Sequence, residues 1–242
     1  MEKHELIIRL KGITFHYSKQ PPILKDLDFQ LYRGDRIGLV APNGAGKTTL
    51  FHVIMGLLQP SAGSIEIFGK RRSREQDFAD IRQRIGLLFQ DADDQLFSPT
   101  VLEDVAFGPL NLGKSREEAI EISRRTLDFL GLSGFEDRIT FKLSGGEKRL
   151  VSLATLLAME PEVLLLDEPS NGLDTTTKSK LIRILKDLNL SYIIISHEFD
   201  ILSETTDSIY SMENGRIILD EHEYVHIHKH SHKIGKQPHR HI

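Results

Sequence analysis

Residues 41–48, Ala-Pro-Asn-Gly-Ala-Gly-Lys-Thr, have the types and order of a phosphate-binding loop. An apolar run precedes them and a helical pattern follows, which is the context that such a loop requires. Backbone N–H groups can converge on phosphate oxygens, the helix N-terminus adds about half a positive charge, and Lys47 adds a full one. The Thr48 hydroxyl can hold magnesium. We therefore expect these residues to bind a nucleotide: Asn43, Gly44, Ala45, Gly46, Lys47, Thr48 and Thr49.

Ala41 departs from the usual loop pattern, which begins with glycine. The backbone at Ala41 must therefore adopt a conformation that a Cβ atom tolerates. The structural alternative for the whole segment is a glycine-rich turn from a strand into a helix, with a threonine near the helix start.

Two acids follow the apolar run Val163 to Leu166. The carboxyl end of a buried parallel strand is the edge where ligands collect, so these acids can divide two tasks. Asp167 is placed to hold magnesium, and Glu168 could orient or deprotonate the water that attacks a γ-phosphate. The alternative is a pair of solvated acids at a strand end.

The segment Leu143-Ser-Gly-Gly-Glu147 begins a helical pattern. Ser144 and Glu147 have the spacing of a capping box, which structure alone could explain. Two glycines in a first turn cost the helix about 1 kcal/mol each, unless close approach to the backbone is needed. A phosphate group that approaches the backbone closely would explain Gly145 and Gly146.

The elements that must position these groups follow from the apolar pattern. Residues 6–39 predict a strand-rich opening region, and Asn214-Gly215 predicts the turn of a late hairpin. Segment 91–113 is polar and marked by prolines, with helical patterns after it. Buried strands joined by helical crossovers indicate a doubly wound core. Strands are expected at 36–40, 85–89, 163–166 and 192–195, and helices at 47–57, 115–130, 144–159 and 175–188.

The loop at 41–48, the acids at 167–168 and the segment at 143–147, taken together, resemble the nucleotide-binding ATPase of ABC transporters over residues 6 to 220. The resemblance implies an α/β fold. Its core would be a P-loop NTPase with a doubly wound, mainly parallel sheet, joined by an N-terminal antiparallel β region and an inserted α-helical subdomain. It also implies binding of ATP and Mg²⁺, and ATP hydrolysis coupled to transport.

The resemblance assigns four further positions. Tyr17 corresponds to the aromatic residue that stacks on adenine, although an ordinary core tyrosine is the alternative. Gln90 matches the Gln loop, which senses magnesium and the attacking water, so the implied Mg²⁺ ligands are Thr48, Gln90 and Asp167. Asp174 lies in the segment matching the D-loop, and His197 matches the switch histidine near the γ-phosphate. The structural alternatives are a strand-end amide for Gln90, a turn residue for Asp174 and a surface histidine for His197.

In this family, two subunits clamp two nucleotides between them. Ser144, Gly145 and Gly146 would then contact the ATP held by Lys47 of the other copy, because a second helix N-terminus supplies donors to the γ-phosphate. Since each motif is present, the second ATPase subunit is expected to be an identical chain. The resemblance further implies a transmembrane coupling subunit, a substrate-binding membrane subunit, and a place at the cytoplasmic face of the cell membrane.

Residues 91–112 resemble the segment that distinguishes energy-coupling-factor ATPases, the group that serves cobalt, nickel and vitamin importers. A polar, proline-marked stretch beside the Gln loop suits a docking groove for a helix of a membrane subunit. The alternative is an ordinary connector.

Residues 221–242 change composition abruptly, and we expect them to form a tail behind a domain that spans 1–220. Imidazole suits nickel, copper, zinc and cobalt, so the tail is a candidate site for imported nickel or cobalt. A purification tag or a solvated tail are the alternatives. The histidines concerned are His222, His226, His228, His230, His232, His239 and His241.

Composition excludes several classes of function. A formal charge of −4 argues against a nucleic-acid polymer as partner, and the absence of cysteine excludes disulfides and thiolate chemistry. No apolar run approaches the roughly 20 residues of a membrane-spanning helix. A P-loop nickel metallochaperone would need an Asn-Lys-x-Asp motif, which is absent, and an ABC ATPase of DNA repair or translation would carry coiled coils or tandem cassettes. A vitamin importer that uses two unequal ATPase subunits stays open as the nearer alternative, if the histidine tail is incidental.

Overall fold

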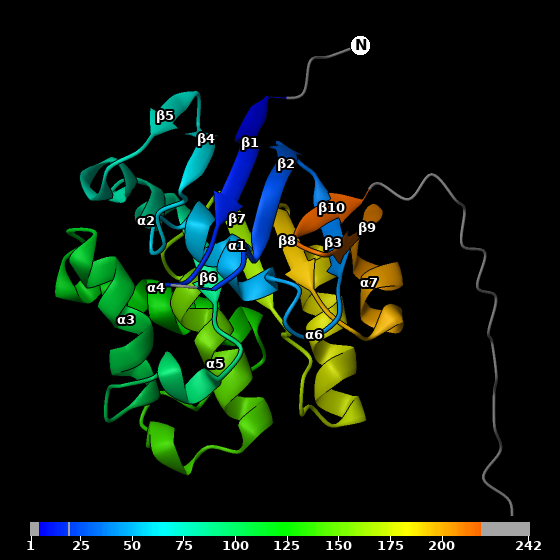
Figure 1. Cartoon of the computed structure of the whole chain (residues 1–242). Coiled ribbons are helices and arrows are strands. Elements are labelled where there is room, and N and C mark those ends of the chain that lie inside the picture. The colour runs from blue at the N-terminus through cyan, green and yellow to red at the C-terminus, as the bar shows by residue number, and fades with distance from the viewer. Residues whose placement is uncertain (1–4, 19, 219–242) are drawn as a thin grey trace, which may run out of the picture.

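The computed structural model describes residues 5–18 and 20–218 of the chain. Two sheets form its framework (Figure 1). The first is antiparallel, in the order β2-β1-β4-β5, and its strands are β1 (Leu6–Phe15), β2 (Leu24–Tyr32), β4 (Ala62–Ile67) and β5 (Lys70–Arg72). It confirms the predicted strand-rich opening region.

The second sheet has the order β10-β9-β3-β8-β7-β6, and all neighbours pair in parallel except the β9–β10 hairpin. The hairpin turns at Asn214-Gly215, as expected. The strands are β3 (Arg36–Val40), β6 (Ile85–Leu88), β7 (Val163–Asp167), β8 (Ser191–Ile195), β9 (Ser208–Glu213) and β10 (Arg216–Ile218).

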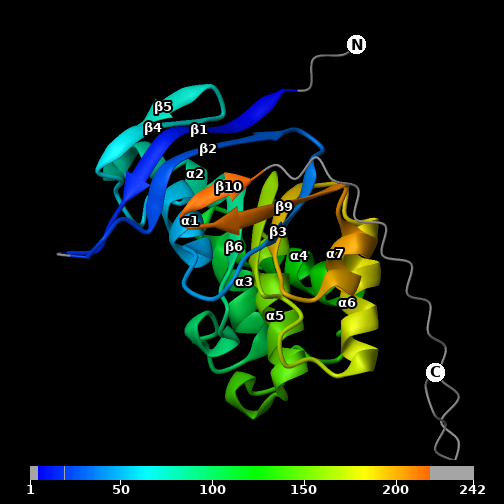
Figure 2. The ribbon, with the colours of Figure 1, turned by 45° about the vertical axis from the view of Figure 1, so that its right-hand side comes forward.

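The helices cover this second sheet on both faces. α1 lies between the two sheets and α2 packs into the same core, whereas α3 to α7 lie on the far side (Figure 2). They are α1 (Lys47–Ile54), α2 (Ile81–Arg84), α3 (Val101–Asn111), α4 (Arg116–Phe129), α5 (Gly145–Leu157), α6 (Thr175–Asp187) and α7 (Phe199–Thr205), with 3-10 turns η1 (Glu75–Phe78), η2 (Ala92–Asp94) and η3 (Thr140–Lys142).

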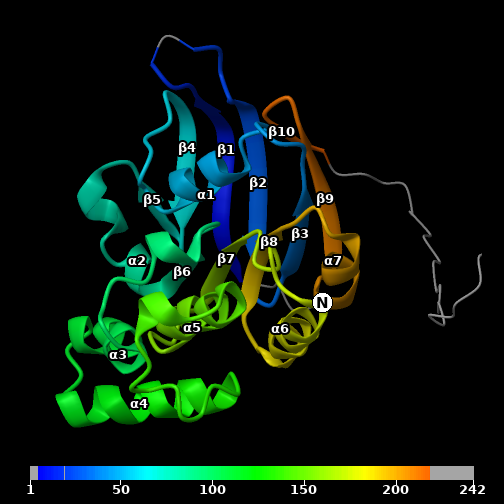
Figure 3. The same ribbon diagram turned by 90° about the horizontal axis from the view of Figure 1, so that it is seen from below.

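β7 shows why its apolar run must be a buried strand. Because successive side chains point to opposite faces, Val163 and Leu165 pack into the core around α1, and Leu164 and Leu166 pack into the core under α5 and α6. Seen from below, α3, α4 and α5 group together near β6, while α6 and α7 lie beside β8 and β9 (Figure 3). The expected inserted helical subdomain is this α3–α5 group.

Two element predictions need correction. Segment 91–113 was expected to be a polar stretch, but it contains the helix α3, which starts with a capping box between Thr100 and Glu103 and accommodates Pro109 near its end. α1 ends at Ile54 instead of residue 57, because Gly56 adopts a φ of 67° where a Cβ atom would meet the ring of Phe78.

Residues 221–242, including the seven tail histidines, lie outside the described residues, and the 1–220 domain boundary stays a prediction. Within the described ranges, no helix is both long and apolar enough to cross a membrane.

Candidate nucleotide-binding site

The loop between β3 and α1 has the shape that its glycines require. Gly44 and Gly46 adopt φ values of 80° and 100°, in the left-handed region. A Cβ atom on Gly46 would lie 2.8 Å from a methyl group of Ile23, so a larger residue would not fit. Ala41, by contrast, is not among the described residues with positive φ, and alanine is tolerated there.

Lys47 is the centre of the site. Its ammonium donates to the Ala41 carbonyl at 2.9 Å and lies 3.2 Å from Glu168 Oε1 and 2.6 Å from His197 Nε2. The same imidazole nitrogen lies 3.2 Å from Asn43 Oδ1. The structure thus brings together four residues that the sequence singled out, from the loop and from the ends of β7 and β8.

Thr48 and Asp167 form a second pair beside this cluster. The Thr48 hydroxyl donates to Asp167 Oδ2 at 2.6 Å, and Asp167 is only 2% exposed. Burial raises the pKa of Asp167, partly opposed by the Thr48 hydrogen bond. A hydroxyl and a carboxylate that share one edge of a cavity are oxygen ligands of the kind that Mg²⁺ prefers, so the residues present fit this ion.

A cavity of about 220 Å³ opens onto these groups. Gln90, in the segment after β6, also lines this cavity. Its side-chain amide lies there with the two acids and the loop. Its lining comprises Ile23, Asn43, Gly44, Gly46, Lys47, Thr48, Thr49, Gln90, Asp167 and Glu168.

Glu168 is held in a strained conformation. Its φ of 46° is left-handed, which costs a non-glycine residue on the order of 1–3 kcal/mol. Two contacts with the neighbouring strand end impose it: the Glu168 amide donates to the Ile195 carbonyl at 2.9 Å, and Glu168 Oε2 accepts from the His197 amide at 3.4 Å. The Glu168 carboxylate lies beside Lys47, whereas the Asp167 carboxylate pairs with Thr48.

Tyr17 lies at the rim of the loop. The residue is 40% exposed, its ring packs edge-on against Phe15 with ring centres 5.0 Å apart, and its hydroxyl is 3.4 Å from Thr49 Oγ1. An exposed aromatic face next to the loop leaves room for a planar base.

Ser144 and the glycine pair lie at the start of α5, and none of the three lines the loop cavity. The capping box is present: Glu147 Oε2 accepts from the Ser144 amide at 2.8 Å, and Ser144 Oγ accepts from the Glu147 amide at 3.3 Å. A Cβ atom on Gly145 would meet nothing within 4 Å, whereas one on Gly146 would lie 3.2 Å from a Thr177 methyl group. No contact within the chain explains Gly145.

Asp174 is likewise outside the cavity. Its carboxylate caps α6, accepting from the amides of Thr176 and Thr177 at 2.9 and 3.1 Å. A hydrogen bond from the Thr177 hydroxyl is the largest cause that lowers the Asp174 pKa.

Sequence reasoning missed Arg149, Gln95 and Lys148, which connect the Gln90 segment to α5. One signal was available: Arg149 stands among apolar residues on a helix that must be buried, where an arginine needs a dedicated partner.

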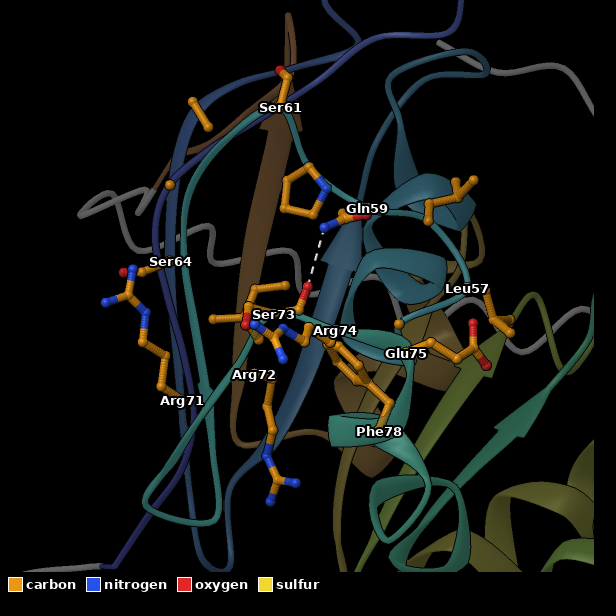
Figure 4. Close-up of a pocket in the computed structure, with 16 residues that line it drawn as sticks. Leu57, Gln59, Ser61, Ser64, Arg71, Arg72, Ser73, Arg74, Glu75 and Phe78 are labelled. Atoms are coloured by element: carbon orange, nitrogen blue, oxygen red, sulfur yellow. Dashed lines mark hydrogen bonds between the residues drawn. The ribbon is translucent and has the colours of Figure 1, made fainter.

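A separate cavity of about 410 Å³ lies between the end of α1 and the β4–β5 hairpin (Figure 4). Arg72, labelled there, forms an ion pair with Asp80 at 2.6 Å and donates to the Ile67 carbonyl. None of the predicted site residues among the described part of the chain lines this cavity.

Comparisons with known proteins agree with this geometry. A family model described as ABC transporter matches residues 24–171. The energy-coupling factor transporter ATP-binding protein EcfA of Methanothermobacter thermautotrophicus is 42% identical over 218 residues, covering 88% of this chain and 70% of that protein. Its namesake from Methanocaldococcus jannaschii is also 42% identical over 218 residues, covering 88% and 78%.

Solved structures give the same result. cbiO1 from Clostridium perfringens, part of the ABC transporter complex cbiONQ, superimposes with a TM-score of 0.80 at 35% identity, covering 89% of this chain and 88% of that one. A dimeric bacterial ABC transporter cassette, MJ0796, has a TM-score of 0.79 at 25% identity, covering 87% and 96%. The chain therefore belongs to the ABC transporter family, as an ATP-hydrolysing subunit of the energy-coupling-factor type.

Proposed function

We propose that this chain binds ATP with Mg²⁺ at the Lys47 cavity and hydrolyses it to drive a membrane importer. The convergence of Lys47, Glu168 and His197 on one point carries this proposal, because a γ-phosphate placed there would meet a cation, a base and an imidazole together. Thr48, Asp167 and Gln90 would hold Mg²⁺, which supplies charge neutralisation when bound.

Each residue then has a task that its position allows. Lys47 leaves its protein partners and pairs with the phosphates. Glu168 accepts a proton from the attacking water, for which its fixed, strained backbone provides orientation. His197 contacts the γ-phosphate, and Tyr17 stacks on the base.

The second ATPase subunit is a second copy of this chain. Ser144, Gly145 and Gly146 do not line the Lys47 cavity of their own chain, and a Cβ atom on Gly145 would meet nothing within 4 Å. A helix start whose first glycine, Gly145, has no close contact in its own chain leaves room for the γ-phosphate held by a partner. Asp174 lies in the segment expected at the same interface.

The surface between Gln90 and Leu112 would receive a transmembrane coupling subunit. It carries Phe97 and Phe107, which are 67% and 48% exposed and stack edge-on with ring centres 4.8 Å apart. Exposed paired aromatics next to a nucleotide-sensing glutamine suit an apolar helix from a membrane partner. The chain would then lie at the cytoplasmic face of the cell membrane, in a complex with a substrate-binding membrane subunit.

Nickel or cobalt is the proposed cargo. Support comes from the seven histidines between 222 and 241, whose imidazoles suit these ions and which lie outside the described residues. Among the described residues there is no histidine, aspartate or glutamate cluster that would hold such an ion. A vitamin is the alternative cargo.

Transport by the assembled complex tests the proposal. The complex should be captured through a tag on this chain and reconstituted in liposomes, and uptake of nickel, cobalt and vitamins should be compared with and without ATP. Uptake of nickel or cobalt that requires ATP and is lost in Glu168→Gln supports the proposal. ATP-driven uptake of a vitamin alone would establish the alternative.

A crystal grown with a non-hydrolysable ATP analogue tests the two-copy site separately. Ser144 and Gly146 should lie against the γ-phosphate that is bound by Lys47 of the other copy. If both are remote from every γ-oxygen in the assembly that forms, the two-copy site is wrong.

A further inference from the structure

Arg149 of α5 is a buried charged group to which no step above assigns a task. It is 5% exposed, and burial lowers the pKa of its guanidinium. No carboxylate of the described residues lies within 4 Å of it. Its Nη1 and Nη2 donate instead to the carbonyl oxygens of Phe89 and Gln90. The buried guanidinium of Arg149 thus satisfies two consecutive backbone carbonyls.

These two carbonyls lie beyond the end of β6, where no neighbouring strand in the described part of the chain supplies a hydrogen-bond donor. β6 ends at Leu88, so the carbonyls of the next two residues lie beyond the strand ladder. A buried carbonyl requires a donor, and the planar fork of an arginine can serve two neighbouring ones at once. A lysine has a single nitrogen at its tip and lacks this planar fork. Arg149 therefore fixes the peptide group between Phe89 and Gln90.

Three further contacts fasten the same segment to successive turns of α5. Gln95 Nε2 donates to the Ser152 carbonyl at 2.8 Å and to Thr155 Oγ1 at 2.9 Å. Lys148 forms an ion pair with Asp93. The stretch from Phe89 to Gln95 is consequently part of the α5 body.

The two ends of this body serve different sites. Gln90 lines the cavity beside Thr48 and Asp167, whereas Ser144 caps α5 five residues before Arg149, about 7.5 Å away along the helix axis. We propose that Arg149 is a positioning residue that makes Gln90 and the Ser144 end of α5 move as one body, so that ATP bound in one site sets the position of the helix start that serves the other. The inference rests on the proposed function, in which Ser144 acts on the partner's ATP.

A distance measurement within one chain tests the coupled movement directly. The chain has no cysteine, so cysteines introduced at the exposed residues Phe141, beside the start of α5, and Lys70, on β5, can be spin-labelled without background. A non-hydrolysable ATP analogue should shift the 70–141 distance distribution in the otherwise unchanged chain. In Arg149→Lys, the analogue should bind but leave the distribution unshifted.

Kinetics of the full chain give the second readout. In Arg149→Lys we expect nucleotide affinity within about twofold of the unchanged chain, a Hill coefficient for hydrolysis that falls from near 2 toward 1, and kcat lower on the order of tenfold. Arg36→Lys is the matched control, because Arg36 also donates to backbone carbonyls, of Lys186 and Leu188, but lies away from the Gln90 segment. It should keep both the Hill coefficient and the distance shift.

The outcomes separate cleanly. An Arg149→Lys chain with the full distance shift and the full Hill coefficient overturns the inference, and so does equal loss in Arg36→Lys. If the unchanged chain binds ATP but never pairs, the two-copy function fails, while the 70–141 distance within one chain still decides whether Arg149 couples Gln90 to α5.

Discussion

Lys47 Nζ lies 2.6 Å from His197 Nε2. The same ammonium donates to the Ala41 carbonyl at 2.9 Å and lies 3.2 Å from Glu168 Oε1. Side-chain and backbone groups of the protein thus contact the Lys47 ammonium where a phosphate would bind it. Binding of a nucleotide must exchange these contacts for phosphate oxygens.

Replacing Lys47 by alanine should therefore weaken nucleotide binding itself. The variant loses charge-assisted hydrogen bonds to phosphate, each worth about 1.5–3 kcal/mol, which corresponds to roughly 10- to 100-fold in affinity. Calorimetric titration with Mg-ATP measures the effect. Lys186→Ala is the control, since Lys186 is exposed and pairs with Glu204 far from the loop. Equal affinities in Lys47→Ala and the unchanged chain would remove the loop from the site.

Replacing Glu168 by glutamine should leave ATP binding intact and slow hydrolysis about 100-fold or more, because the water loses its base while the phosphate contacts survive. The variant should also accumulate as an ATP-bound pair of chains. Phosphate release and size-exclusion chromatography report the two effects.

Glu160→Gln is a matched control, because Glu160 is exposed and shares the left-handed backbone, with a φ of 53°. Its turnover should be normal. Normal turnover in Glu168→Gln would show that another group acts as the base.

The sequence identified the chemical groups of the site better than their surroundings. The loop and the two acids could be predicted because each ends a buried apolar run and parallel strands place their carboxyl ends at one edge, whereas His197 was predicted from the family resemblance. α3 was not predicted because its segment is polar and marked by prolines, yet Pro99 precedes the cap residue Thr100 and Pro109 lies near the helix end.

Contacts between segments that are distant in the sequence could not be predicted from it. Arg149 and the carbonyls of Phe89 and Gln90 are about 60 residues apart, and no periodicity relates a side chain to a remote carbonyl. The left-handed backbone of Glu168 was equally hidden, since the contact between its amide and the Ile195 carbonyl joins two strands that are far apart in the sequence.

Replacing Asp167 by asparagine should stabilise the fold while abolishing the proposed magnesium site. Burial raises the pKa of Asp167, which means that the folded chain disfavours its ionised form. A neutral residue of the same shape removes that penalty, so in the absence of nucleotide and magnesium the melting temperature should rise. Mg-dependent hydrolysis should be lost. Asp187→Asn, at the exposed end of α6, should change neither, and a lower melting temperature for Asp167→Asn would contradict the assignment.

Glu162 predicts a pH dependence of stability. It accepts from Arg84 at 2.6 Å and from Arg33 at 2.9 Å, and these contacts, with the Arg84 hydrogen bond first, lower its pKa below 4.5. The stabilisation is complete above the unfolded pKa and is lost as pH falls through the lower folded pKa. Urea midpoints at pH 7 and pH 3.5 should therefore differ less in Glu162→Gln than in the unchanged chain. Equal differences would show that the two arginine contacts do not stabilise the fold.

Replacing Gly145 by alanine separates what the single chain needs from what the paired site needs. Within one chain, a Cβ atom at this position meets nothing within 4 Å, and alanine favours a helix over glycine by about 0.5–1 kcal/mol. The variant should therefore unfold at a slightly higher temperature than the unchanged chain. Its ATP-induced pairing and its hydrolysis should nevertheless fall, because the added methyl group stands between the helix start and the partner's phosphate. Thermal unfolding, chromatography with ATP and phosphate release measure the three quantities on one preparation. If Gly145→Ala pairs and hydrolyses like the unchanged chain, no phosphate approaches this backbone, and the helix start at Ser144 does not serve a second copy.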